Sequence, residues 1–153
     1  MTKWNRFKEI SKTYGAILET GEKSVTLTSS KSGMKVSVSE EEYFTDEFKF
    51  VKDMEYDVAF FTQHRYFDKL ADAANYVRRI MDDDVIAVQF YNAWDEPVFG
   101  GDIDKNAFDK LTSTYLSHLF GIQEEIVSQY SVDTRSWSGD RDLKKKELRF
   151  MPR

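Results

Sequence analysis

The sequence predicts an α+β fold, with an antiparallel sheet of about five to six strands and helices packed mainly on one face. Two patterns indicate this class. Apolar residues alternate with polar ones over residues 16–39, as in half-buried antiparallel strands, and recur at helical spacing over residues 68–81. The elements follow in the order helix, strands, helix, hairpin and helices, which favours α+β over repeated βαβ units.

Length and composition limit the fold and the chemistry. A chain of 153 residues with 41% hydrophobic residues can bury a substantial core, so we expect one globular domain over residues 1–153. The sequence has no cysteine and only two histidines, which excludes disulfide bonds and Cys- or His-rich metal sites. We expect no metal and no cofactor. No stretch resembles a signal peptide or a membrane span, so we expect a cytoplasmic protein that does not enter a membrane.

A helix and a three-stranded meander open the chain. One face of the helix carries Trp4, Phe7, Ile10 and Tyr14. We expect Thr2 to cap its start and Gly15 its end, because threonine accepts hydrogen bonds from free N–H groups and glycine adopts the left-handed conformation that ends helices. Alternation then predicts three strands at about residues 16–20, 24–29 and 33–39.

A fourth strand, at about residues 56–62, precedes the clearest helix of the sequence. That helix covers about residues 68–81, with Asp68 as its expected N-cap. Its apolar face carries Phe67, Leu70, Ala74, Val77 and Met81. The next strand, residues 85–91, is apolar on both faces and belongs in the interior of the sheet. Pro97 begins a return strand at or near a sheet edge, because proline cannot donate to a ladder.

Helices and a basic segment complete the chain. Asp104 is the expected cap of a helical segment that Gly121 divides into helices at about residues 105–119 and 122–130. The remainder contains turn residues and a run of three lysines, which is typical of solvated tails. This pattern favours a loose basic tail from about residue 140. Partial docking of the tail is favoured by Leu143, Leu148 and Phe150.

The net charge of −5 is unevenly distributed. Residues 1–39 contain seven Lys or Arg and three Asp or Glu, whereas residues 40–140 contain nine and 22. Residues 141–153 are basic again, with six against two. An acidic body favours basic partners over nucleic acid, although acidic surfaces also serve solubility alone.

No catalytic signature is present, since a nucleophile elbow, a Walker loop, a dinucleotide fingerprint and HExxH are all absent. We therefore predict a non-enzymatic protein that binds another protein with a basic surface. Its acidic, aromatic-containing surface would block or regulate that partner, as immunity proteins and phage-type inhibitors do, including those that mimic nucleic-acid charge. A bacterial or phage source fits this type. The partner-binding candidates are Glu40, Glu41, Glu42, Tyr43, Asp82, Asp83, Asp84, Trp94, Asp95 and Glu96.

Two alternatives stay open. The first is a nucleic-acid-binding accessory protein that neutralises phosphates with its two basic ends. Its candidate residues are Lys3, Arg6, Lys8, Lys12, Lys144, Lys145, Lys146 and Arg149. The second is a small-ligand sensor or enzyme built around His64 and Arg65, a pair that could bind an anion.

Overall fold

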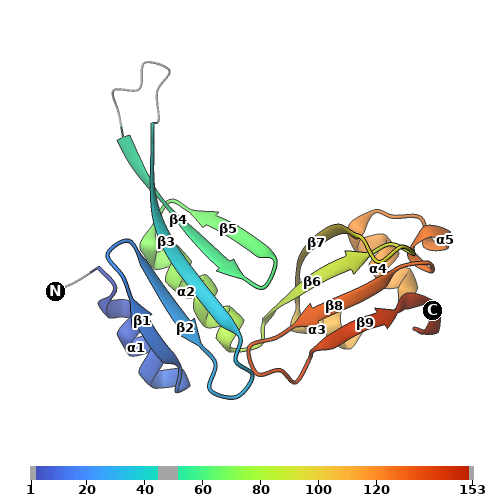
Figure 1. Cartoon of the computed structure of the whole chain (residues 1–153), viewed down its shortest axis with the longest axis horizontal. Coiled ribbons are helices and arrows are strands. Elements are labelled where there is room, and N and C mark those ends of the chain that lie inside the picture. Colours follow the sequence, from blue (N-terminus) through green and yellow to red (C-terminus); the bar gives the residue numbers. More distant parts are fainter. Residues whose placement is uncertain (1–2, 45–51, 152–153) are drawn as a thin grey trace.

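The computed structural model describes residues 3–44 and 52–151, in which the chain forms an α+β fold with two antiparallel sheets. The five-stranded first sheet has the order β1-β2-β3-β4-β5, and the four-stranded second sheet has the order β7-β6-β8-β9. Figure 1 shows the two sheets next to each other, with the connection from α2 to β6 between them. The predicted class is confirmed, but the strands divide between two sheets instead of forming one.

The two halves of the chain each build one sheet with its own helices. The first half contains α1 (Asn5–Tyr14), β1 (Ile17–Thr20), β2 (Ser24–Thr28), β3 (Lys35–Phe44), β4 (Lys52–Phe60), β5 (Gln63–Phe67) and α2 (Leu70–Met81). The second half contains β6 (Val85–Tyr91), β7 (Pro97–Asp104), α3 (Lys105–Asp109), α4 (Ser113–Phe120), α5 (Glu124–Val127), β8 (Ser131–Arg135), β9 (Leu143–Glu147) and the 3₁₀ helix η1 (Leu148–Phe150). Within the described ranges, none of the helices has the length and apolar character needed to cross a bilayer.

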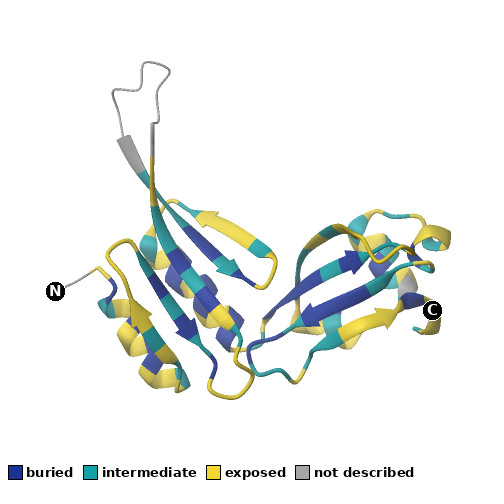
Figure 2. Cartoon of the chain, viewed as in Figure 1, coloured by how far each residue is buried: buried dark blue, intermediate teal, exposed yellow. Residues whose placement is uncertain are grey.

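The first sheet buries one face against α1 and α2. Two cross-strand rows on that face are Val25, Val38 and Val58, and Leu27, Val36 and Phe60. The helices complete this core with Phe7, Ile10, Ala73, Ala74, Val77 and Ile80. Burying one such side chain contributes about 1.5–3 kcal/mol, so these rows decide which face the helices cover. Figure 2 shows the buried residues concentrated in the middle strands of both sheets.

The second sheet has a separate core, and β6 contributes to both. The members of this core from β6 and the three short helices include Ile86, Val88, Phe90, Ala107, Leu116 and Val127. Val85 and Ala87 of β6 belong instead to the core of the first sheet. The strand is therefore apolar on both faces because each face meets a different core, and its interior position between β7 and β8 agrees with the prediction.

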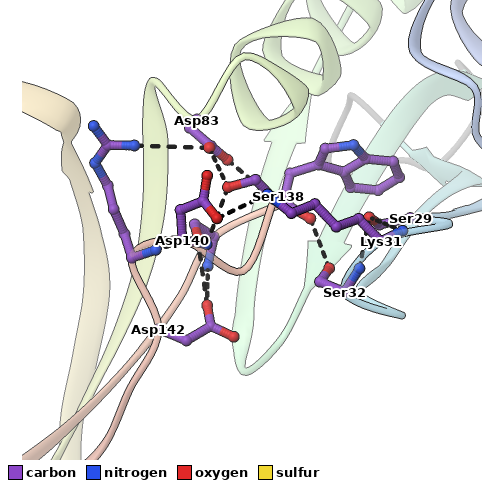
Figure 3. A network of polar contacts seen from close by, with 10 residues as sticks. Ser29, Lys31, Ser32, Asp83, Ser138, Asp140 and Asp142 are labelled. Atoms are coloured by element: carbon purple, nitrogen blue, oxygen red, sulfur yellow. Dashed lines mark hydrogen bonds and ion pairs between the residues drawn. The ribbon is translucent and has the colours of Figure 1, made fainter.

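The loop between β8 and β9, residues 136–142, joins the two halves of the chain. Its Trp137 is only 6% exposed and packs in the core of the first sheet. Asp83, which follows α2, accepts a 3.0 Å hydrogen bond from the backbone N–H of Ser138 and another from its hydroxyl (Figure 3). The Arg141 guanidinium lies 3.7 Å from the same carboxylate. The sharp turn at Asp83, with φ of +60°, sets the carboxylate in this position.

The turn between β2 and β3 contacts the same loop from the other side. The Ser32 hydroxyl donates a 2.6 Å hydrogen bond to the carbonyl of Trp137, and Lys31 Nζ lies 2.8 Å from Asp140 Oδ1. These contacts and the buried indole hold the second sheet against the first at a point distant in sequence from the α2–β6 connection.

The sequence does not predict β5, β8 or β9. Two of them, β5 and β9, are edge strands, where charged side chains are common because they discourage pairing with other chains. The predicted loose tail is wrong for the segment from about residue 140 to Met151, because this segment forms β9 and then buries Leu148 fully. Phe150, however, is 66% exposed and does not dock.

The residues predicted to cap α1 and α2 are confirmed only in part. Gly15 ends α1 with φ of +63°, as predicted. Thr2 lies outside the described residues. Asp68 does not cap α2, because the N-cap position is Lys69 and no side chain bonds to the free N–H groups there.

The helical segment after β7 forms three short helices instead of two. Asp104 caps α3 by accepting a 2.7 Å hydrogen bond from the N–H of Ala107. A further cap, not predicted from the sequence, is Thr112, which accepts a 3.0 Å hydrogen bond from the N–H of Tyr115 and starts α4. Gly121 ends α4 with φ of +67°.

Candidate functional site

The face of the first sheet that points away from α1 and α2, which we call the open face, carries mainly polar side chains. Strand alternation sends every second residue of β1 to β5 to this face. Four of its cross-strand rows are Ile17, Thr28 and Lys35; Glu19, Thr26, Ser37, Ala59 and His64; Ser24, Ser39, Asp57 and Tyr66; and Glu41 and Glu55. All of them except Asp57 are exposed or half-buried, so this surface is available to a partner (Figure 2).

Three carboxylates gather on the open face and form what we call the acidic patch: Glu41, Glu55 and Asp57. Glu41 pairs directly with Glu55 in the register of β3 and β4, and Asp57 is the next residue of β4 on this face. Like charges directly opposite each other destabilise a sheet by roughly 0.2–1 kcal/mol. Among the described residues, no Lys or Arg forms an ion pair with Glu41 or Glu55. The patch therefore carries negative charge that the described part of the chain leaves uncompensated.

Tyr66 and His64 of β5 border the acidic patch. Tyr66 pairs with Asp57 across the strands and is 53% exposed. The charge of Asp57 raises the pKa of the Tyr66 phenol above its ordinary value, and partial desolvation and the two glutamates of the patch add to the effect. His64 Nδ1 lies 3.0 Å from Asp57 Oδ2, with the carboxylate as acceptor. An exposed tyrosine beside carboxylates can receive a cation through both the charges and its ring.

The acidic run in the second half of β3, residues 40–42, contributes one residue to the patch. Glu41 faces outward, whereas Glu40 and Glu42 alternate to the other side of the sheet. Glu40 forms an ion pair with Lys3 there. The side chain of Tyr43 lies outside the described residues, so only its backbone pairing in β3 is known.

The three predicted aspartates after α2 lie at the joint between the halves of the chain. Asp82 Oδ1 accepts a 2.7 Å hydrogen bond from the Tyr14 hydroxyl, and Asp83 binds the joining loop. Asp84 is exposed. Two of the three carboxylates are thus engaged within the chain, which removes them from the candidate interface.

Trp94, Asp95 and Glu96 occupy the β6–β7 turn. Trp94 is 80% exposed at the tip of this turn, Asp95 lies 2.6 Å from Lys145 Nζ, and Glu96 accepts a hydrogen bond from the amide of Asn92. Figure 1 shows this turn at the end of the second sheet remote from the first. The predicted partner-binding residues therefore fall into three separate places, and the acidic patch and Trp94 do not form one compact site.

The two basic ends do not meet. Figure 1 shows α1 at one end of the molecule and β9 at the other. The run Lys144, Lys145 and Lys146 lies in the edge strand β9, where lysines protect an open edge. A continuous phosphate-binding surface built from both ends is therefore not formed.

His64 and Arg65 point to opposite faces of the first sheet, so they do not form one anion site. His64 lies on the open face with Asp57. Arg65 lies on the helix side, with Nη1 3.3 Å from Asp102 and its guanidinium 5.1 Å from the centre of the Tyr76 ring. The pKa of Tyr76 is raised by burial and, in addition, by the hydrogen bond that the Tyr76 hydroxyl donates to Asp102.

Glu55, Asp57 and Tyr66 were not among the predicted site residues. Alternation in the fourth strand could have indicated that Asp57 faces away from Val58 and Phe60, but the pairing of Glu41 with Glu55 depends on register. In residues 3–44 and 52–151, no three His, Asp or Glu side chains are arranged to hold a metal ion. No protein-family model, curated protein or solved structure matches the chain.

Proposed function

We propose that this chain is a non-enzymatic binding protein that docks a basic surface of another protein on its acidic patch and thereby blocks or regulates it. The observation that supports this is the direct pairing of Glu41 with Glu55 on an exposed sheet face, beside Tyr66. A neutral or basic residue at either position would make the pair of strands more stable. A cation supplied from outside the chain is the simplest complement to this arrangement.

The expected contact is an Arg or Lys of the partner placed between the two glutamates. An arginine fits best, because its planar guanidinium can bind carboxylates in bidentate fashion and stack on the ring of Tyr66. The five strands, at about 4.8 Å spacing, make a face about 20 Å wide, which suits a protein partner better than a small ligand. An immunity-type or inhibitor-type role is the regulatory class we propose for such a surface.

Affinity capture from the native host with matched variants tests the proposal. One variant is Glu41→Gln/Glu55→Gln, and the control is Asp72→Asn/Glu125→Gln, which removes the same charge from exposed positions on α2 and α5. The wild type and the control should retain a basic protein at about 0.1 M NaCl and release it at about 0.5 M, because salt screens charge pairs. The patch variant should not retain it.

Three results would contradict the proposal: an acidic partner, binding that is indifferent to salt, or equal retention by the patch variant and the control. Hydrolysis or other turnover of the partner would contradict the non-enzymatic part.

A further inference from the structure

A cleft of about 590 Å³ lies between the two sheets and carries a net positive charge in its lining. Its charged residues are Lys35 of β3, Arg135 of β8, Lys144 of β9 and Asp142 of the joining loop. The chain as a whole has a net charge of −5, so three cations against one carboxylate mark this cleft as unusual. The cleft is not part of the acidic patch.

Two other clefts of the described part of the chain have balanced charges. In the cleft beside the β6–β7 turn, Lys145 lies 2.6 Å from Asp95, and Arg149 lies 3.0 Å from Glu147. In a third cleft, two arginines face two aspartates, and Arg65 is paired with one of them. An anion entering either cleft would have to displace a carboxylate.

Within the described part of the chain, the three cations of the cleft between the two sheets are not paired with carboxylates. Arg135 Nη1 donates to the backbone carbonyls of Thr134 and Leu143, at 2.8 and 3.0 Å, which orients the guanidinium without removing its charge. Within residues 3–44 and 52–151, neither Lys35 nor Lys144 forms an ion pair. An anion can therefore enter without breaking an ion pair at either lysine.

The carboxylate of the cleft is already engaged. Asp142 Oδ1 accepts a 2.8 Å hydrogen bond from the backbone N–H of Ser136. It thus fixes the joining loop, and among the described residues it forms no ion pair with Lys35 or Lys144.

Phe61 adds an aromatic surface to the cleft. It lies in the turn between β4 and β5 with φ of +51°, in a conformation that a bulky residue rarely adopts and that Asn or Gly usually fill. The Arg135 guanidinium lies 5.0 Å from the centre of its ring, and the residue is 38% exposed. A strained, partly exposed phenylalanine packed on an arginine presents ring surface on which a planar group can stack.

We propose that this cleft binds a nucleoside phosphate, with the phosphates against Lys35 and Lys144 and the base on Phe61. The volume lies within the range of small-molecule sites, about 300–1,000 Å³, and exceeds what inorganic phosphate requires. Cations that neutralise phosphates beside an aromatic ring that stacks a base are the combination used for nucleotides and for single strands. A free nucleotide and the terminal nucleotide of a single strand share this chemistry.

Calorimetric titration of the full chain with ATP and with pyrophosphate at low salt tests the site. Lys144→Gln and Lys146→Gln form a matched pair, because both lysines are exposed on β9 but only Lys144 lines the cleft. We expect Lys144→Gln to weaken the binding of both ligands by about fivefold to tenfold and Lys146→Gln by less than about twofold. The proposal is overturned if ATP does not bind at about 1 mM, or if the two variants weaken binding equally.

Phe61→Asn tests the contribution of base stacking separately from that of the phosphates. Asparagine tolerates the positive φ at this position, so we expect the variant to fold. ATP binding should weaken by about fivefold while pyrophosphate binding is unchanged. An equal effect on the two ligands contradicts base stacking on Phe61.

An oligo(dT) of about eight nucleotides, titrated in the same way, distinguishes the two sources of the ligand. Tighter binding of the oligonucleotide than of ATP supports a single strand, and the reverse supports a free nucleotide. The Glu41→Gln/Glu55→Gln variant should retain ATP binding, so failure of the protein interface and failure of this site are distinguishable.

Discussion

Glu41 on β3 lies directly opposite Glu55 on β4, on the exposed face of the first sheet. Directly paired residues have Cβ atoms about 4.5–5.5 Å apart, so their carboxylates repel each other. The packed core on the other face of the sheet allows the strands to pair in this register despite that repulsion. The charge remains available to a partner.

Removing one charge of this pair should stabilise the protein while weakening partner binding. We expect Glu55→Gln to raise the free energy of unfolding by about 0.5 kcal/mol at low salt, and by less at high salt, where the repulsion is screened. Urea unfolding measures both values, with Glu22→Gln, at an exposed position in the turn between β1 and β2, as the control for a lost surface charge. A Glu55→Gln protein less stable than the wild type would show that the pair is not repulsive.

Trp137 should be essential for joining the two halves of the chain. Because its indole is buried in the core of the first sheet, we expect Trp137→Ala to lower the free energy of unfolding by about 3–5 kcal/mol. Trp94→Ala makes the same substitution at a residue that is 80% exposed, and we expect a change within about 0.5 kcal/mol.

Urea unfolding followed by circular dichroism and by fluorescence measures both tryptophan variants. Coincident transitions in the wild type would support the predicted single domain. An unchanged midpoint for Trp137→Ala would contradict the structural role of the joining loop.

Stability should fall at alkaline pH in part because of Tyr14. Burial, with the hydrogen bond to Asp82 adding to it, raises the pKa of Tyr14 from 10.0 to about 12. The folded protein thus binds this proton more tightly than the unfolded chain does. The resulting stabilisation is fully present below the unfolded pKa and is lost as pH rises through the folded one.

The magnitude should be small, about 1 kcal/mol or less, because Tyr14 is partly exposed to solvent. Urea unfolding at about pH 9 and about pH 11.5 measures the loss, and Tyr14→Phe should make it smaller. An equal loss in the variant would show that Tyr14 does not contribute.

Periodicity in the sequence predicts the elements that have one apolar face, such as α2, and it predicts β6 from its length and apolar content. It does not predict β5 and β9, because edge strands bury little and carry charges. It also predicts one sheet, since nothing in a local pattern indicates that β6 presents its two faces to different cores.

The candidate site depends on contacts that composition cannot reveal. The acidic runs identify carboxylates, but Asp82 and Asp83 bind Tyr14 and Ser138, which are 68 and 55 positions away. Glu55 and Tyr66 become site residues only through the register of β3, β4 and β5. The charge pattern of the sequence therefore identifies Glu41 as a candidate, but it does not identify Glu55 and Tyr66, which lie near it in the sheet.

The most direct measurement is an NMR titration of the isotope-labelled chain with the captured basic partner. We expect the backbone signals of Glu41, Glu55, Asp57 and Tyr66 to shift on binding and those of the β6–β7 turn to stay unchanged. Shifts confined to the turn around Trp94, with the acidic patch unaffected, would contradict docking on the patch.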